Sequence, residues 1–295
     1  MHPGDRVAVV APAGPFDRAS FEAGLAPLEQ RYRVQFDAHL FERHRYLAGS
    51  DSRRLSQLRA ALTDPEIRAV FCARGGYGTM RLLPRLAEEF AAIRADGWKP
   101  LVGFSDITAL HQGLQRQGLV SIHGPVVTQL AAQPESARER LFALLESGSA
   151  PTSVAGTNTY VGGTVEGPLL GGNLTVFTRL LGTQFLPRLE GAILLLEEVG
   201  ERPYRLDRMW THLALAGAFR KVAGIVLGSF TRCEEKDADY TGAEVLRDLA
   251  VETGLPCAAG FHIGHSDINE AVPLGVRVRL DADARRLDFL ESATA

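Results

Sequence analysis

The sequence has few cysteines and no long run of apolar residues. Its three cysteines, Cys72, Cys233 and Cys257, lie far apart and show no C-x-x-C spacing, so neither a disulfide framework nor a zinc knuckle is predicted. No apolar segment is long enough to span a bilayer, and the first residues lack the apolar core of a signal peptide. We therefore expect a cytoplasmic protein without a membrane partner.

An excess of charge of one sign is also missing. The 295-residue chain has 32 Lys and Arg residues against 35 Asp and Glu residues, and its formal net charge is −3. The basic residues are scattered or occur in pairs such as Arg53-Arg54, so no nucleic-acid partner is expected. The sequence contains no H-E-x-x-H motif, no EF-hand loop and no Cys/His cluster. We therefore expect neither a metal ion nor another cofactor.

Strand-like and helix-like segments alternate through the first half of the chain. Apolar runs at residues 7–11, 67–73 and 100–104 are separated by helix-like segments such as 51–63. This alternation predicts an α/β fold, in which a mostly parallel sheet is flanked by helices. Ligands of such sheets bind beyond the carboxyl ends of the strands.

A change of composition separates the two halves of the chain. Residues 133–156 are rich in Pro, Ser, Ala and Glu, and residues 156–172 are rich in Gly and Thr; new strand-like and helix-like segments follow. We predict an N-terminal α/β domain at residues 1–150 and a linker at 151–165. A smaller C-terminal α/β domain with strand-rich elements is predicted at 166–295, and its last part, 272–290, alternates like a β-hairpin.

A serine stands at the end of one of the predicted strands. The apolar run stops at Gly103, Ser105 follows, and a helix-like segment covers 107–117. A serine on a tight turn from strand to helix is exposed at the edge of the sheet, and the N–H groups that start the helix point towards its hydroxyl. This arrangement suits a nucleophile with half of an oxyanion hole. The alternative is a helix cap without chemistry, which is common for Ser and Asp.

A serine nucleophile needs a base. His265 lies in a glycine turn after the apolar residues 256–261 and is the first candidate, followed by His123 and His262. For each of them the alternative is an ordinary structural histidine.

The base in turn needs an acid that orients it. Glu197 and Glu198 close the apolar run at 192–197. A carboxylate at such a position is costly to bury unless it is paired, so either residue is a candidate to hold an imidazolium. The alternative is a strand end in water whose glutamates pair with nearby arginines.

Two glycine-rich loops add candidates for binding. The segment Arg74-Gly75-Gly76-Tyr77-Gly78 follows a buried strand, and its glycines allow backbone amides to approach a ligand closely. It lacks the patterns of a P-loop or a dinucleotide site, so we expect Gly76 to supply an oxyanion donor; a plain turn is the alternative. The second loop, Gly171-Gly172-Asn173, opens a helix, and Asn173 is either a substrate-binding residue or an N-cap.

Taken together, these motifs resemble the LD-carboxypeptidases, serine peptidases that act on murein fragments, with the microcin-immunity peptidases as relatives. The resemblance covers nearly the whole chain, and it depends on the order and spacing of the motifs. The segments that carry it are VVAPAG at 9–14, RGGYG at 74–78, GFSDIT at 103–108, HGP at 123–125, LGGNL at 170–174, LEEVGERPYRLDRM at 196–209, GH at 264–265 and PLG at 273–275.

The resemblance implies a catalytic triad of Ser105, Glu197 and His265, with backbone N–H groups of Gly76 and Asp106 as the oxyanion hole. It implies a murein tetrapeptide as the substrate, cut between meso-diaminopimelate and the terminal D-Ala. The tripeptide product is reused in wall synthesis, so the expected role is peptidoglycan recycling. A homodimer and an active site between the two domains are also expected.

Arg74 is a candidate for binding the free carboxylate of the terminal D-Ala, because a guanidinium fits a carboxylate through two contacts. The alternative is that Arg74 braces its loop.

Two other functions of the protein remain open. One is a microcin-immunity-type peptidase that cleaves peptidyl-nucleotide conjugates, which the small number of tryptophans, Trp98 and Trp210, disfavours. The other is a non-catalytic protein that binds murein fragments.

Overall fold

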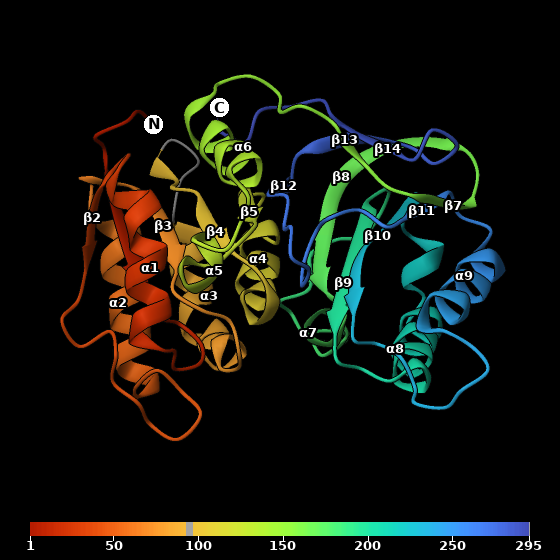
Figure 1. Cartoon of the computed structure of the whole chain (residues 1–295), viewed down its shortest axis with the longest axis horizontal. Helices are drawn as coiled ribbons and strands as arrows, with labels where there is room; N and C mark the ends of the chain where they lie inside the picture. Colours follow the sequence, from red (N-terminus) through yellow and green to blue (C-terminus); the bar gives the residue numbers. More distant parts are fainter. Residues whose placement is uncertain (93–96, 295) are drawn as a thin grey trace.

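The chain folds around two β-sheets that lie side by side (Figure 1). The structure, a computed structural model, describes residues 1–92 and 97–294. Among these residues no helix is both long enough and apolar enough to cross a membrane.

The first sheet comes mainly from the first half of the chain and is parallel, as predicted. Its strands are β1 (Arg6–Val10), β2 (Arg33–Phe36), β3 (Ile67–Cys72), β4 (Leu101–Gly103), β5 (Ser121–His123) and β12 (Val272–Leu274). They are arranged in the order β12-β5-β4-β3-β1-β2, and only β12 runs antiparallel to its neighbour. The carboxyl ends of β3, β4 and β5 therefore share one edge of the sheet.

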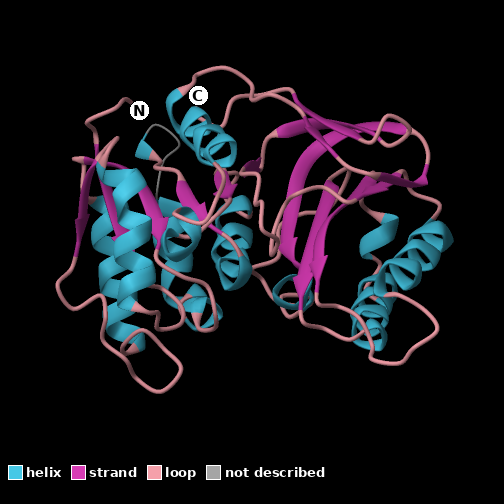
Figure 2. Cartoon of the chain, in the orientation of Figure 1, coloured by secondary structure: helices cyan, strands magenta, loops and turns pink. Residues whose placement is uncertain are grey.

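Helices cover both faces of this sheet (Figure 2). They are α1 (Arg18–Glu29), α2 (Asp51–Thr63), α3 (Leu83–Ala92), α4 (Thr108–Gln115), α5 (Val127–Leu130) and α6 (Glu135–Glu146), with the 3₁₀ turns η1 (Thr79–Arg81) and η3 (Ser105–Ile107). Adjacent residues of β3 point to opposite faces, so Val70 and Cys72 join one apolar cluster while Ala69 and Phe71 join another. This confirms that the sheet is buried on both sides.

The second sheet is larger and mixed. Its strands are β6 (Val154–Ala155), β7 (Asn158–Val161), β8 (Thr164–Asn173), β9 (Ile193–Val199), β10 (Gly224–Thr231), β11 (Cys257–Ala259), β13 (Arg277–Asp281) and β14 (Arg286–Phe289). The helical elements of this half are α7 (Leu174–Thr178), α8 (Pro203–Leu215), η4 (Ala218–Arg220) and α9 (Gly242–Thr253). Strands β8 to β11 are parallel, and the other pairings are antiparallel.

Two segments do not follow the predicted division of the chain. Residues 272–290 were expected to form one hairpin, but only β13 and β14 do so, while residues 272–274 form β12 and pair with β5 of the first sheet. The hairpin expectation was therefore wrong at its start, because the cross-sheet pairing there takes the backbone hydrogen bonds. Residues 151–165, predicted as a linker, contribute β6 and β7 to the second sheet.

Helix α4 holds the two sheets together close to the carboxyl ends of their strands. The side chain of Gln112 donates a hydrogen bond to the carbonyl of Gly171 at 2.7 Å. The backbone N–H of Asn173 donates to Thr108 Oγ1 at 2.9 Å. Gly171 and Asn173 lie at the end of β8, and β8 pairs with β9. Because α4 follows β4 in the chain, these bonds fix the end of β4 relative to the end of β9.

Candidate active site

Ser105 lies on a strained turn that follows β4 and is the first residue of η3. Its φ of +64° is in the left-handed region, which residues other than glycine rarely adopt and which is often found at functional sites. A Cβ atom at Gly75 would lie 2.9 Å from Ser105 Cβ and 3.1 Å from its Oγ. The glycine loop at 74–78 therefore lies directly against the serine, and it needs glycine at that point.

The same loop supplies the first of the two expected oxyanion donors. Gly76 has a φ of +107°, which glycine adopts at no steric cost. The loop is held by a hydrogen bond from Gly14 N to the Gly75 carbonyl at 3.0 Å. Within the described residues, neither the N–H of Gly76 nor that of Asp106 donates a hydrogen bond, so both groups are free to bind a ligand.

The side chain of Asp106 fastens the Ser105 turn to the glycine loop. Its buried carboxylate accepts hydrogen bonds from Thr79 N and from Thr79 Oγ1, each at 2.9 Å. Burial raises the pKa of this carboxyl.

Arg54, whose side chain is fully buried, donates to the carbonyls of Pro12 and Gly78. The sequence did not predict these contacts, because each joins residues from distant segments.

Two buried histidines, His111 and His123, lie near the Ser105 turn but are not part of it. His111 Nε2 donates to the Gly103 carbonyl at 2.8 Å, and burial lowers the pKa of His111 to about 4. His123, an alternative candidate for the base, is fully buried, and neither of its ring nitrogens has a hydrogen-bond partner in the described part of the chain. Burial holds its pKa well below the usual range, and no carboxylate of the described residues pairs with it.

Glu197 and His265 form a hydrogen-bonded pair. His265 Nδ1 lies 2.7 Å from Glu197 Oε2, and the backbone N–H of His265 donates to the same oxygen at 3.2 Å. The glutamate is fully buried, whereas the histidine side chain keeps 16% of its surface exposed. A Cβ at Gly264 would lie 2.4 Å from Glu197 Oε2, so glycine at 264 allows this close approach. His262, the third candidate, is exposed.

The imidazole of His265 lies next to the Ser105 turn. Its ring centroid is 4.6 Å from that of Phe104, the residue that precedes the serine. The structure thus brings together Ser105 from the first sheet and the Glu197–His265 pair from the second. No hydrogen bond joins Ser105 and His265 in the structure, as is common for catalytic contacts before substrate binds.

Glu198 has a different environment from Glu197. Adjacent strand residues point to opposite faces of the sheet, and Glu198 faces the start of α7. Its carboxylate accepts hydrogen bonds from Asn173 Nδ2 at 3.0 Å, from Thr175 N at 2.8 Å and from Val199 N at 2.8 Å. Burial raises the pKa of Glu198. Of the two candidate acids, only Glu197 contacts a histidine.

The two predicted substrate-binding side chains already have protein partners. Asn173 Oδ1 accepts a hydrogen bond from Val176 N at 3.1 Å, which confirms the alternative of an N-cap. Arg74 is exposed, and its Nη1 donates to the Pro15 carbonyl. That contact is the bracing alternative, and it leaves the rest of the guanidinium at the surface beside Gly75. A role of either residue in substrate binding stays a prediction.

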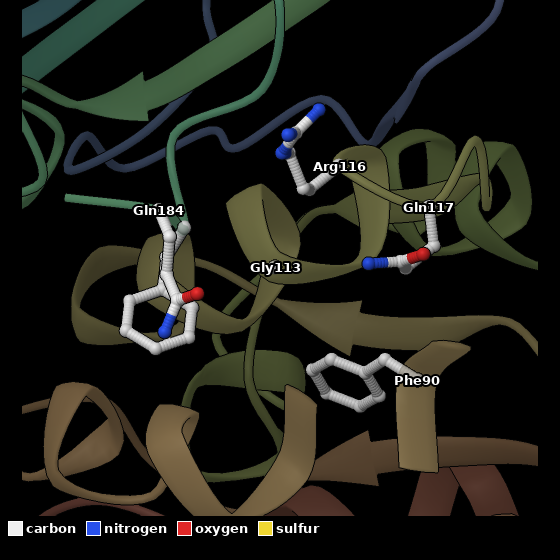
Figure 3. A pocket seen from close by; sticks show the side chains of 6 residues that line it. Phe90, Gly113, Arg116, Gln117 and Gln184 are labelled. Carbon is white, nitrogen blue, oxygen red and sulfur yellow. The ribbon is translucent and has the colours of Figure 1, made fainter. Parts of the chain in front are cut away.

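A separate hollow lies between the two halves of the chain (Figure 3). Its volume is about 300 Å³. The residues that line it are Phe90, Gly113, Arg116, Gln117, Gln184 and Phe185. None of the predicted site residues is among them.

Over the described ranges, no group of three or more His, Cys, Asp or Glu residues could hold a metal ion.

Comparisons with known proteins show the family of the chain. Residues 7–124 match the family model of the LD-carboxypeptidase N-terminal domain, and residues 166–280 match that of the C-terminal domain. The murein tetrapeptide carboxypeptidase of Pseudomonas aeruginosa is 38% identical, over 95% of this chain and 94% of the relative.

Solved structures show the same fold. The crystal structure of muramoyltetrapeptide carboxypeptidase from Oxalobacter formigenes is similar with a TM-score of 0.86 and 30% identity, over 96% of this chain and 98% of that one. The microcin C7 self immunity protein MccF has a TM-score of 0.87 over 100% of this chain and 98% of its own, but at 22% identity this likeness concerns the fold alone. The chain belongs to the LD-carboxypeptidase family of peptide hydrolases.

Proposed function

We propose that the protein is a serine-type LD-carboxypeptidase that releases the terminal D-Ala from murein tetrapeptides by cutting after meso-diaminopimelate. The observation that carries this proposal is the 2.7 Å contact of His265 Nδ1 with the buried Glu197, next to the strained turn of Ser105. The names of the relatives from Pseudomonas aeruginosa and Oxalobacter formigenes support the choice of a murein peptide. Peptidoglycan recycling in the cytoplasm by a homodimer is part of the same proposal.

The first half of the reaction would form an acyl-enzyme. Ser105 Oγ attacks the carbonyl carbon of meso-diaminopimelate while His265 Nε2 takes its proton, and Glu197 holds the Nδ1–H of the resulting imidazolium. The backbone N–H groups of Gly76 and Asp106 bind the oxyanion of the tetrahedral intermediate. When the C–N bond breaks, His265 returns the proton to the departing D-Ala nitrogen.

Water then completes the reaction by the reverse roles. His265 takes a proton from the water, the hydroxide adds to the ester carbonyl, and the proton passes to Ser105 Oγ as the tripeptide leaves. Each oxyanion donor contributes roughly 2.7–4 kcal/mol of transition-state stabilisation in enzymes of this kind. Such a contribution requires donors that are fixed in advance, and the bonds of Thr79 to Asp106 and of Gly14 to Gly75 hold both donor segments in place.

An exopeptidase must also recognise the free carboxylate at the end of its substrate. Arg74 is exposed and precedes Gly75, the residue whose Cα lies against Ser105. A guanidinium next to the oxyanion loop can bind the carboxylate one residue beyond the scissile bond. We assign this role to Arg74 as part of the proposal.

The direct test is release of D-Ala from a murein tetrapeptide, measured with wild type and with Ser105→Ala in the presence and absence of EDTA. The proposal expects release by wild type that EDTA does not reduce, and no release by the variant. Activity that is lost with EDTA and restored by a divalent ion would contradict the serine mechanism. Hydrolysis of an aspartyl sulfamoyl adenosine instead of the tetrapeptide would favour the microcin-immunity alternative, whose relative MccF has been solved with that compound.

A further inference from the structure

Two exposed tyrosines contact each other beside the candidate active site. Tyr46 is 56% exposed and Tyr77 is 47% exposed. Their ring centroids are 5.7 Å apart, with an angle of 61° between the ring planes. Single exposed aromatic residues are ordinary, but two that meet on the surface from separate segments form a larger apolar face, and such faces mark binding sites.

The tyrosine pair, Tyr46 and Tyr77, is attached to the loop that lies against Ser105. Tyr77 follows Gly76 directly in that loop. A Cβ at Gly14 would lie 3.1 Å from the Gly75 carbonyl oxygen and 3.7 Å from the Tyr46 carbonyl oxygen, so Gly14 lies close to both the glycine loop and the backbone of Tyr46. The position of the pair relative to the serine is therefore set by backbone contacts.

This inference rests on the proposed function. The chemistry of a murein tetrapeptide then indicates which group the tyrosine pair could bind. The side chains of a murein tetrapeptide are methyl groups, carboxylates and an amine, and none of them has a flat apolar face. The muramoyl sugar, which is joined to the first residue of the peptide, does offer the C–H face of a pyranose ring. Aromatic side chains provide broad apolar contact surfaces together with a polar end, and the tyrosine hydroxyls can bond to the hydroxyls of a sugar.

The lengths of extended chain are compatible with such a contact. Three residues separate the sugar from the scissile bond, which corresponds to about 10 Å of extended chain. Tyr77 lies two residues from Gly75, which is at most about 7 Å of backbone, and its side chain extends beyond that. We propose that Tyr46 and Tyr77 form a subsite for the pyranose ring of the muramoyl group, so that the enzyme prefers tetrapeptides that still carry this sugar.

The test compares kcat/KM for a muramoyl-tetrapeptide and for the free tetrapeptide. Wild type should prefer the sugar-linked substrate. Tyr46→Ala and Tyr77→Ala should each reduce that preference by about five- to tenfold, as expected for loss of one aromatic contact. Tyr46→Phe and Tyr77→Phe keep the ring and should retain most of the preference. Tyr240→Ala removes a tyrosine of similar exposure, 44%, from the other half of the chain and should change nothing.

Two results would overturn the subsite. One is a wild type without preference for the sugar, and the other is an equal loss on both substrates in the alanine variants, which would mean that the pair serves the peptide or the loop. A protein that releases no D-Ala from either substrate would refute the proposed function instead. In that case calorimetric binding of muramoyl-tripeptide still decides the inference, since it predicts about five- to tenfold weaker binding by the alanine variants than by wild type, and equal binding would contradict it.

Discussion

The turn after β4 and the loop after β11 hold their polar groups by different means. Ser105 is positioned by the backbone, through its φ of +64° and through the Gly103 carbonyl that accepts a bond from His111 at 2.8 Å. His265 is positioned by a side chain, since its Nδ1 is held by the carboxylate of Glu197 at 2.7 Å. The position of Ser105 therefore does not depend on its own hydroxyl, whereas the position of His265 depends on both its imidazole and the Glu197 carboxylate.

The difference has consequences for mutation. Removing the Ser105 hydroxyl leaves every contact of its turn in place, so such a change should alter chemistry alone. Removing the Glu197 carboxylate leaves His265 without its partner, so orientation and local packing change together. Comparing variants of Ser105 and Glu197 therefore separates loss of reactivity from loss of position.

The largest effect is expected for Ser105→Ala. Loss of a triad serine typically reduces kcat by a factor on the order of 10⁶, and release of D-Ala should fall by that amount. The melting temperature should stay close to that of wild type, because the backbone sets the turn. Retention of more than a few per cent of wild-type turnover would refute the assignment of Ser105 as nucleophile.

The next effect distinguishes the two adjacent glutamates. Glu197→Gln should reduce kcat by a factor on the order of 10⁴, the loss known for an orienting acid. Glu198→Gln keeps the Glu197–His265 pair and should mainly reduce stability, by about 1–3 kcal/mol, because it disturbs a buried hydrogen-bond network. Steady-state kinetics and urea unfolding of both variants measure the contrast. A larger loss of kcat in Glu198→Gln would show that Glu197 is the wrong acid.

A smaller effect is expected at Arg74. If its guanidinium binds the substrate carboxylate, wild type should prefer a tetrapeptide with a free terminus over the amidated one. Arg74→Ala should then lower that preference by about tenfold or more, the value of a hydrogen bond to a charged group, and Arg74→Lys should lose less. An unchanged ratio in Arg74→Ala would leave only the bracing contact with Pro15.

The smallest effect concerns the dependence of stability on pH. Burial lowers the pKa of His111 from 6.5 to about 4 in the folded chain. Between these values the unfolded state binds the extra proton, so the free energy of unfolding falls as the pH falls, by about 1.4 kcal/mol per pH unit for one group. His111→Gln should reduce the slope by that amount in urea unfolding between pH 4 and pH 6.5, whereas His262→Gln, at an exposed position, should not. Equal slopes for wild type and His111→Gln would contradict this account.

Local patterns in the sequence predicted most of the fold. The helix at 51–63 is present as expected, and so are the buried strands around the site. The short strand β12 was not predicted as a separate element, because three residues that include Pro273 give a weak local signal and their partner β5 is distant in sequence.

The candidate site was likewise predicted in part from local patterns, while the rest depends on contacts between distant residues. Ser105 was predicted from its local turn, but the choice between Glu197 and Glu198 came from a family resemblance, since two adjacent acids at a strand end look alike in sequence. Arg54 was noted only as part of the short basic pair Arg53-Arg54, yet its side chain is fully buried. Its partners are the nearby carboxylate of Asp51 and, from distant segments, the carbonyls of Pro12 and Gly78.

The central claim is that a serine from the first sheet reacts while an acid–histidine pair from the second sheet assists it. The most direct measurement treats the protein with a phosphonofluoridate analogue of the tetrapeptide and maps the modified residue by mass spectrometry while D-Ala release is followed. The account predicts one modified residue per chain, Ser105, with activity lost in proportion to the label and with much slower labelling in His265→Ala. A label on another residue, or full activity after Ser105 is labelled, would contradict it.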